Sequence, residues 1–446
     1  MKVCIVGSGH VGLVTGACMA EIGHRVVCVD DDRKKIVTLR AGRMPFYEPH
    51  LEDLVSRNRS QGRLKFTHRI ENGIEQATVI FICVGTPALA SGEADLSSVE
   101  QVARRIAENA TGYKVVVEKS TVPVQTGRWI ERTLAVYKGR MGHCDVASNP
   151  EFLREGSAVH DFFHPDRIVV GVHDERAEKL LRELYAPVVD GTFRCPIHLP
   201  CTNGERVPLV VTDIESAELI KHASNSFLAM KISFINAVAD LCERAGADVG
   251  RVAEGMGLDR RIGRSFLNAG IGFGGYCFPK DLQAFVKIAE KFGYDFALLK
   301  EVERINRGRA DIVLQKLKDR LWIIKGKRIG VWGLAYKPDT DDVREAPAFG
   351  IIQRLVQEGA DVRVYDPKAM DNARAEIQGV TFCLDPYEAA KGAEALVLTT
   401  EWEEFKGLDL SRVKALMQWP LLLDGRNFFE KEAMREVGFE YLGIGR

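Results

Sequence analysis

The N-terminal segment constrains the fold more than any other part of the chain. An apolar run at residues 2–6 has the pattern of a buried strand, and it leads directly into the glycine-rich turn Gly7-Ser8-Gly9-His10-Val11-Gly12, where a helical pattern begins. A second apolar run, at residues 25–29, ends in Asp30. Strand, glycine turn, helix, strand and acidic residue in this order and spacing are typical of a dinucleotide-binding unit.

Each part of this segment has a physical role in binding a dinucleotide. We expect Gly7 to form the tight turn, Gly9 to let backbone amides approach a pyrophosphate, and Gly12 to let the helix pack closely on the strand. The positive end of the helix dipole would face the phosphates. Asp30 would accept hydrogen bonds from both ribose hydroxyls of an adenosine and would repel a 2′-phosphate, so the sequence favours NAD over NADP.

Short apolar runs alternate with helical stretches along the rest of the first half of the chain. They occupy residues 78–84, 114–118, 145–148 and 167–171. This alternation predicts an α/β fold with a parallel, doubly wound sheet, in which ligands bind at the carboxyl ends of the strands. Turn-forming residues follow three of these strands, and we expect them to surround the nicotinamide half of the cofactor: 85–87, 120–123 and 149–151.

A long helical stretch runs from residue 212 to about residue 245 and has the character of a spine between two lobes. Residues 212–215 have the pattern of a capping box. Lys221 and Asn225 are four residues apart and hence on one face of this helix, where together they would form an oxyanion clamp. The alternative interpretation is an ordinary solvated helix face.

The strand–helix alternation starts again near residue 327, with apolar runs at 327–333, 360–367, 395–400 and 421–426. This second lobe echoes the N-terminal segment but lacks its glycine triplet, so we expect it not to bind the pyrophosphate of a dinucleotide. Cations that suit a diphosphate on a substrate stand near its strand ends, although solvation alone would also explain them: Lys337, Arg344 and Arg426.

A glycine-rich turn in the middle of the chain carries one cysteine between aromatic residues. Residues 272–281 read Gly-Phe-Gly-Gly-Tyr-Cys-Phe-Pro-Lys-Asp. The glycines let the backbone approach a ligand, and Pro279 is expected to start a helix. Cys277 would then lie at a helix N-terminus, where the partial positive charge and Lys280 favour the nucleophilic thiolate. Most cysteines of intracellular enzymes are inert core residues, but a core position needs none of these neighbours.

Composition argues against several classes of function. The 446 residues carry 61 basic and 62 acidic side chains, a net charge of −1, so no global basic field attracts nucleic acid or an anionic membrane surface. No apolar stretch has membrane-spanning length and the chain begins on a strand pattern, so we expect a cytoplasmic protein. The cysteines, of which Cys195 and Cys201 are the nearest pair, form no C-x-x-C motif, so we expect neither a zinc site nor disulfides.

Taken together, these segments resemble the family of UDP-glucose and GDP-mannose dehydrogenases over nearly the whole chain. The motifs that carry the resemblance are Gly7 to Gly12, Pro45-Phe46-Tyr47-Glu48-Pro49, Val84-Gly85-Thr86-Pro87, 118–123, 148–156, the helix of Lys221 and Asn225, the cysteine segment, and Gly333 to Glu345. The resemblance implies two Rossmann-like lobes joined by a long central helix. It also implies a two-step, four-electron oxidation of a sugar's primary alcohol to a carboxylate, with two NAD consumed.

The resemblance further implies domains, an assembly and site residues. The domains would be 1–211 for NAD, 212–312 for dimerisation and catalysis, and 325–446 for the UDP-sugar, in a homodimer or higher homo-oligomer. The implied catalytic residues are Cys277 as nucleophile, Lys221 and Asn225 at the oxyanion, Asp281 positioning or activating water with Lys221, and Glu151 as general base, with Thr121 nearby. The implied NAD site comprises Gly7, Gly9, His10, Val11, Gly12, Asp30, Lys35, Val84, Gly85, Thr86, Ser120, Thr121, Glu155, Lys280 and Arg344. The implied substrate site comprises Glu151, Phe152, Leu153, Arg154, Glu155, Lys221, Asn225, Phe266, Asn268, Gly272, Phe273, Gly274, Gly275, Tyr336, Lys337, Arg426, and Arg261 reaching into a partner subunit's site.

Two features depart from the family pattern. The stretch 194–211 is longer than the usual connection into the central helix, and Tyr276 stands where a small residue, often serine, precedes the cysteine. A bulky ring there would reshape the pocket that holds the hexose. UDP-glucose is still the first expectation for the substrate, because residues 45–51 and 277–281 resemble that branch of the family, and GDP-mannose or an N-acetylhexosamine nucleotide is the second. Two alternatives from other classes are a two-electron hydroxyacid dehydrogenase and a catalytically silent NAD-binding scaffold.

Overall fold

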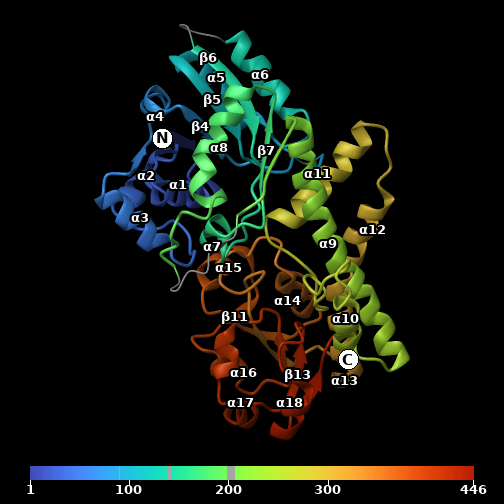
Figure 1. Ribbon diagram of the computed structural model, residues 1–446. Coiled ribbons are helices and arrows are strands. Elements are labelled where there is room, and N and C mark those ends of the chain that lie inside the picture. Colours follow the sequence, from blue (N-terminus) through green and yellow to red (C-terminus); the bar gives the residue numbers. More distant parts are fainter. Residues whose placement is uncertain (90, 138–141, 198–205) are drawn as a thin grey trace. The chain divides into compact units, whose positions relative to one another are not determined.

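The computed structural model describes residues 1–89, 91–137, 142–197 and 206–446. The chain forms two compact units, residues 1–224 and 225–446, each with its own sheet and core (Figure 1). Residues 198–205, which include Cys201 and part of the long 194–211 stretch, lie outside the described residues.

The first unit alternates strands and helices, as the sequence predicts. In chain order it comprises β1 (Lys2–Val6), α1 (His10–Glu21), β2 (Arg25–Val29), α2 (Arg33–Arg40), α3 (Leu51–Ser60), β3 (Leu64–Thr67), α4 (Ile70–Gln76), β4 (Val79–Ile82), α5 (Ser97–Asn109), β5 (Gly112–Glu118), α6 (Thr126–Val136), β6 (Gly142–Ser148), α7 (Ala158–Phe163), β7 (Ile168–Val172), α8 (Glu175–Val189), β8 (Leu209–Thr212) and the start of α9 (Ile214–Ala245), which continues into the second unit.

The strands of the first unit form one sheet with the order β3-β2-β1-β4-β5-β6-β7-β8. All neighbouring pairs are parallel except β6 and β7, which run antiparallel. The expectation of a parallel sheet is therefore confirmed up to β6, whereas β7 and β8 run in the opposite direction. The sequence did not predict this reversal, because an apolar run alone carries no information on strand direction. Because β1 lies between β2 and β4, the strand order reverses at its carboxyl end, where such sheets bind ligands.

The apolar residues of β1 are buried on both faces of this sheet. Val3 and Ile5 belong to one hydrophobic core, whereas Cys4 and Val6 belong to the core on the opposite face. Successive side chains of a strand point to opposite faces, and helices cover both faces of a doubly wound sheet. This explains why the strands read as continuous apolar runs instead of alternating ones.

The second unit contains the rest of α9, four further helices before its sheet, and then another strand–helix alternation. In chain order its elements are α10 (Val249–Gly257), α11 (Cys277–Lys291), α12 (Ala297–Arg307), α13 (Arg309–Leu321), β9 (Arg328–Trp332), α14 (Pro347–Gln357), β10 (Asp361–Tyr365), α15 (Met370–Glu376), β11 (Val380–Phe382), α16 (Pro386–Ala390), β12 (Ala395–Leu398), η1 (Glu403–Gly407), α17 (Leu410–Leu416), β13 (Leu421–Asp424), α18 (Lys431–Val437) and β14 (Glu440–Leu442).

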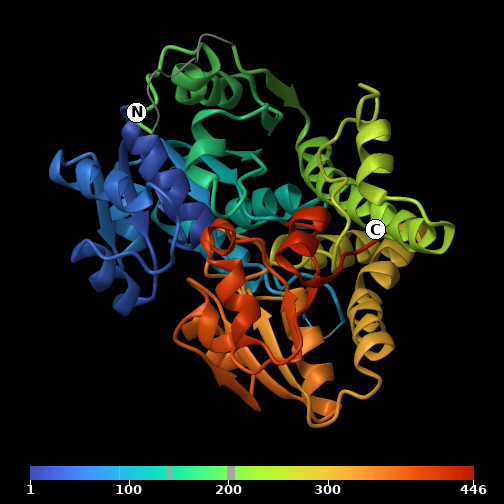
Figure 2. The ribbon, with the colours of Figure 1, turned by 90° about the horizontal axis from the view of Figure 1, so that it is seen from below.

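The second sheet has the order β11-β10-β9-β12-β13-β14, and every neighbouring pair is parallel. Its strands lie among helices (Figure 2). Read from the first strand of each sheet, this order repeats that of the first six strands of the other sheet, 3-2-1-4-5-6. The predicted pair of Rossmann-like lobes is therefore confirmed.

Helix α9 spans the predicted range and has 32 residues. Its N-terminus differs in one detail from the predicted capping box. Asp213, not Thr212, caps the helix: its carboxylate accepts the Ser216 backbone N–H at 2.7 Å. Glu215 instead pairs with the Arg128 guanidinium, so it is not available to complete a box.

Candidate active site

The glycine turn after β1 is shaped by close approaches of the backbone. Gly7 has φ +100°, and a Cβ there would lie 2.4 Å from the Cys83 carbonyl oxygen. A Cβ at Gly12 would lie 1.9 Å from the Gly7 carbonyl oxygen. A Cβ at Gly9 would meet no atom within 4 Å, and no side chain caps α1 at this position. The first and third glycines are therefore needed for packing, while Gly9 leaves open space at a helix N-terminus, where backbone amides bind phosphate.

Asp30 ends β2 beside this turn. Its carboxylate accepts the Ser8 N–H at 2.8 Å and the Lys35 ammonium at 2.8 Å. The residue is buried, with 7% of its surface exposed. The structure thus brings together the glycine turn, Asp30 and Lys35, three parts of the predicted cofactor site.

His10 and Glu48 link the glycine turn to the loop after β6. The His10 Nε2 atom lies 2.7 Å from a Glu48 carboxylate oxygen, and Glu48 also accepts the backbone N–H groups of Gly156 and Ala158 at 2.8 and 2.9 Å. Burial opposes protonation of His10, but its hydrogen bond to Glu48 and the charge of Glu155 raise its pKa above the ordinary value. Glu48 lies in a motif that the sequence marks, but its role as an anchor was not predicted.

The turns after β4, β5 and β6 are cross-linked by side chains. Thr86 donates its hydroxyl to the Thr121 carbonyl at 2.8 Å, and Ser120 donates to the Val84 carbonyl at 2.8 Å. Lys119, which sequence reasoning missed, donates its ammonium to the Asn149 side chain at 3.0 Å. Its burial lowers its pKa. The predicted nicotinamide-side turns therefore form one continuous edge.

Lys221 and Glu151 form a buried ion pair. The Lys221 ammonium donates to a Glu151 carboxylate oxygen at 2.9 Å and to the Glu151 carbonyl at 2.6 Å, and the two side chains are 5% and 4% exposed. The other carboxylate oxygen of Glu151 accepts the Leu153 N–H at 2.7 Å, and the Lys221 ammonium lies 5.5 Å from the centre of the Phe152 ring. A predicted base and a predicted oxyanion ligand are thus direct partners.

Two neighbours of Lys221 on α9 hold the loop that carries Thr121. The His222 Nε2 lies 2.7 Å from the Val122 carbonyl oxygen. The Glu218 carboxylate accepts the N–H groups of Gln125 and Gly127 at 2.6 and 2.7 Å, at the start of α6. Sequence reasoning missed both residues, because each partner lies 91 to 100 residues away along the chain.

The cysteine segment of the second unit begins α11, and Cys277 is the first residue of that helix. The predicted helix is confirmed, but it begins at Cys277, two residues before Pro279, where its start was expected. Gly272 and Gly275 have φ +97° and +81°, and a Cβ at Gly274 would lie 2.1 Å from the Glu345 carbonyl oxygen. The glycines are therefore required by the backbone path that presents the cysteine.

Asp281 is fully buried one turn after Cys277. Its carboxylate accepts the Asn225 side-chain N–H at 2.7 Å and lies 3.2 Å from the Lys280 ammonium. On the other side of the loop, the Asn306 side chain makes two hydrogen bonds to the Phe273 backbone, at 2.8 and 2.9 Å. Asn306 was not predicted from the sequence.

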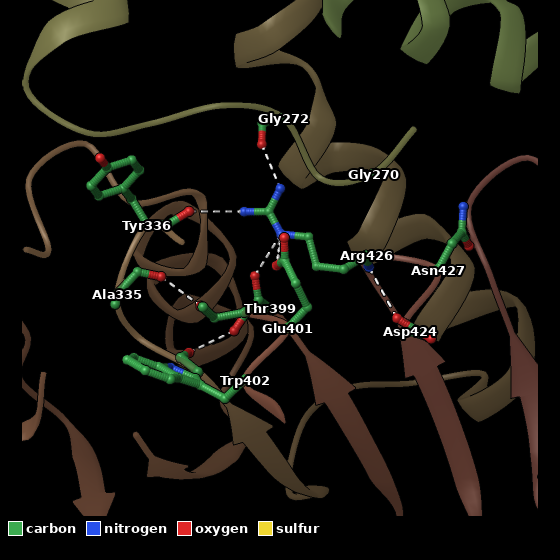
Figure 3. A network of polar contacts seen from close by, with 12 residues as sticks. Gly270, Gly272, Ala335, Tyr336, Thr399, Glu401, Trp402, Asp424, Arg426 and Asn427 are labelled. Atoms are coloured by element: carbon green, nitrogen blue, oxygen red, sulfur yellow. Dashed lines mark hydrogen bonds and ion pairs between the residues drawn. The ribbon is translucent and has the colours of Figure 1, made fainter. Parts of the chain in front are cut away.

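Arg426 ties the cysteine segment to the loops of the second sheet (Figure 3). Its guanidinium donates to the carbonyls of Gly272 at 2.8 Å, Tyr336 at 3.2 Å and Thr399 at 2.8 Å. It also pairs with Glu401 at 3.4 Å. Arg426 therefore joins two predicted substrate residues, Gly272 and Tyr336, and three of its hydrogen bonds go to backbone oxygens.

The second lobe keeps the counterpart of Gly7 but differs from the first in the partners of the counterpart of Asp30. Gly333 has the same φ of +100° as Gly7. Asp366, at the end of β10, is 1% exposed and accepts hydrogen bonds from the Leu334 and Ala335 amides and from the Trp402 indole. The carboxylate of Asp366, the counterpart of Asp30, thus binds two backbone amides and an indole of its own lobe.

The remaining predicted site residues lie as follows. Arg154 pairs with Asp161 at 2.5 Å and Arg344 with Asp342 at 2.6 Å. Arg261 pairs with Asp259 at 2.6 Å, and its side chain is 89% exposed. Lys337 lies 5.7 Å from the centre of the Tyr336 ring, and Phe266 6.2 Å from the Phe278 ring. Glu155 is half-buried near His10, and Asn268 is exposed.

Within the described ranges, no helix is long and apolar enough to cross a membrane, and no group of three or more histidine, cysteine or acidic residues is arranged to hold a metal ion.

Three domain models of one known protein family match most of the chain. Residues 1–189 match the NAD binding domain of the UDP-glucose/GDP-mannose dehydrogenase family, residues 215–308 its central domain, and residues 330–431 its UDP binding domain.

Named relatives agree with this. The chain is 46% identical over 447 residues to the UDP-glucose 6-dehydrogenase TuaD of Bacillus subtilis, covering 100% of this chain and 93% of that protein. It is 47% identical over 450 residues to a UDP-glucose 6-dehydrogenase of Rhizobium meliloti, covering 100% of each. Among solved structures, a UDP-glucose dehydrogenase from Pyrobaculum islandicum superimposes with a TM-score of 0.89 at 41% identity, covering 99% of this chain and 97% of that one.

Proposed function

The chain belongs to the UDP-glucose/GDP-mannose dehydrogenase family and oxidises UDP-glucose with NAD as cofactor, and from this premise we propose that it does so through a covalent thioester on Cys277. The relatives at 40–47% identity are UDP-glucose 6-dehydrogenases, whereas a structure named for UDP-D-ManNAc is 27% identical. GDP-mannose, an N-acetylhexosamine nucleotide and a hydroxyacid are therefore not favoured as substrates.

One observation carries the proposal: Cys277 opens helix α11 on a glycine loop, one turn before a fully buried carboxylate, Asp281. A helix N-terminus favours the thiolate form of a cysteine, and thiolate is the form that attacks a carbonyl carbon. A buried carboxylate held by Asn225 is suited to accept a proton from water.

The first unit fits the cofactor. Open space at Gly9, the uncapped start of α1 and the carboxylate of Asp30 suit a pyrophosphate and an adenine ribose. NAD, when bound there, accepts a hydride in each of the two oxidations.

The residues of the chain then have the following roles in this proposal. Glu151 takes the proton of the primary hydroxyl as the alcohol becomes an aldehyde. The Cys277 sulfur bonds to the aldehyde carbon, and the electron pair of the C=O bond moves to oxygen, where Lys221 and Asn225 stabilise the negative charge. Oxidation of this thiohemiacetal gives a thioester.

Hydrolysis completes the sequence. Asp281 accepts a proton from water as the water oxygen bonds to the thioester carbon. The C–S bond breaks, and its electron pair returns to sulfur as thiolate, so that the product is the carboxylate. The rigidity of a helix explains the placement of Lys221 and Asn225 on successive turns of α9, because charge stabilisation requires donors held in place.

The test counts electrons per sugar. With limiting UDP-glucose and excess NAD, we expect two NADH and one carboxylate product for each sugar consumed. Cys277→Ala abolishes acid formation, whereas Cys144→Ala, a change at another partly buried cysteine, keeps it. A ratio of one NADH per sugar, or acid formation by the Cys277→Ala variant, would contradict the proposal.

We also propose that the chain works as a homodimer in the cytoplasm. On α9, Phe227, Phe234 and Leu241 are seven residues apart and 58%, 52% and 63% exposed. A heptad stripe of apolar side chains is suited to pack against the same stripe of a second copy, and Arg261 would then serve the partner's site. Sedimentation equilibrium should give twice the chain mass, and Phe234→Glu should give monomers; a monomeric unmodified protein would contradict this assembly.

A further inference from the structure

The ring of Tyr276 lies next to two cations at the start of α11. The Arg344 guanidinium carbon is 4.4 Å from the ring centre and the Lys280 ammonium is 5.2 Å from it. Both distances are within the range of about 6 Å over which a ring attracts a cation. Tyr276 directly precedes Cys277, and Lys280 stands three residues after that cysteine on the same helix face.

Each of these cations is fixed from a second side by a carboxylate. Arg344 forms a two-pronged ion pair with Asp342, at 2.9 and 2.6 Å, and Lys280 lies 3.2 Å from Asp281. The backbone adds a link, since the Gly275 N–H donates to the Arg344 carbonyl at 2.9 Å. The aromatic ring is therefore the shared partner of two charges that would otherwise repel one another.

Packing does not account for Tyr276 in the way that it accounts for the other aromatic residues of this loop. Phe273 is part of a hydrophobic core cluster of the second unit, and Phe278 packs against that cluster. Phe273 and Phe278 also contact each other edge to face, with ring centres 5.8 Å apart. Tyr276 is half-buried and belongs to none of the core clusters of the described residues.

We propose that Tyr276 is a positioning residue, whose ring holds the cations of Arg344 and Lys280 beside the helix end that carries Cys277. This inference rests on the proposed role of Cys277. Positive charge near a thiol favours its reactive anion, and the family resemblance assigns both cations to NAD. The reactivity of the thiol and the affinity for NAD are therefore the two properties that loss of the ring should change.

Two substitutions separate the ring from the rest of the side chain. Tyr276→Leu removes the aromatic face and keeps an apolar side chain, while Tyr276→Phe keeps the face and removes only the hydroxyl. Two quantities are measured: the rate of Cys277 alkylation by iodoacetamide at pH 7, followed by peptide mass spectrometry, and the KM for NAD alongside kcat. We expect Tyr276→Leu to slow alkylation and to raise the KM for NAD, each by about tenfold, and Tyr276→Phe to stay within about twofold of the unmodified enzyme.

Arg344→Gln tests the same contact from the other side. This substitution should raise the KM for NAD. In the double variant with Tyr276→Leu, the KM for NAD should rise by less than the product of the two factors measured for the single variants. Circular dichroism shows whether Tyr276→Leu folds. If it does not, Arg344→Gln and Tyr276→Phe still test the inference, because an unchanged alkylation rate and an unchanged KM for NAD in Arg344→Gln would overturn it. So would a Tyr276→Leu variant that behaves like the unmodified enzyme, or a Tyr276→Phe variant as impaired as Tyr276→Leu. Each of these results leaves the proposed function intact if Cys277→Ala is inactive, whereas an active Cys277→Ala variant overturns the function itself.

Discussion

Glu218 should make the folded chain less stable as the pH rises. It is 2% exposed on α9, and burial is the main cause that raises its pKa from 4.5 to about 7, against the opposing hydrogen bonds from Gly127 and Gln125. Because its folded pKa lies above its unfolded pKa, its contribution to stability is fully present below pH 4.5 and is lost as the pH rises through 7. The full shift corresponds to about 3 kcal/mol, of which about 1 kcal/mol is lost between pH 6 and pH 8.

Urea unfolding at pH 6 and pH 8 measures this effect when the unmodified protein is compared with Glu218→Gln. The variant keeps a side-chain oxygen for one of the two amides but cannot ionise. We expect the free energy of unfolding of the unmodified protein to fall from pH 6 to pH 8 by about 1 kcal/mol more than that of the variant. Equal pH dependence in the two proteins, or a steeper fall in the variant, would refute the reasoning.

Three further predictions follow from single contacts. Gly12→Ala should lower the free energy of unfolding by about 3 kcal/mol, because its Cβ would lie 1.9 Å from a carbonyl oxygen. Gly9→Ala should change the free energy of unfolding by no more than about 0.5 kcal/mol and should raise the KM for NAD, so similar unfolding midpoints for the two variants would contradict the prediction. Asn225→Leu should cost about 2 kcal/mol in urea unfolding because it removes a donor from the buried Asp281, and the double change with Asp281→Leu should recover part of that loss; strict additivity would argue against the contact. Asp30→Ser should raise kcat/KM for NADP relative to NAD at least about tenfold, and an unchanged ratio would show that the acid does not select the cofactor.

Local patterns predicted the parts of the fold that depend on neighbouring residues. The β1 strand, the turn at Gly7 and Gly12, and the helix that begins at Cys277 each follow from a few consecutive side chains. The second strand–helix alternation was also readable, because a new series of apolar runs begins near residue 327, whereas the Rossmann-like order of both sheets was expected from the family resemblance. The reversal of β7 was not, because strand direction is decided by connections and not by the run itself.

The polar residues that hold the site together could not be predicted in the same way. Glu48 and Lys119 lie in motifs whose local pattern does not reveal their partners, and Glu218 and Asn306 are ordinary polar residues in the sequence. The partners of these four residues lie between 30 and 110 positions away. Only the fold brings each one to the backbone or side chain that it anchors. The direct pairing of Lys221 with Glu151 was hidden for the same reason, although both residues were expected in the site.

Trapping the acyl group on sulfur tests the central claim most directly. Asp281→Asn, which lacks the proposed proton acceptor for hydrolysis, is incubated with UDP-glucose and NAD, quenched in acid and digested, and the peptide that contains Cys277 is weighed by mass spectrometry. We predict a peptide heavier by the UDP-glucuronyl group, with the mass removed by hydroxylamine and absent when NAD is omitted. An unmodified Cys277 peptide from a sample that has produced NADH, or an acyl group on any other residue, would contradict the account.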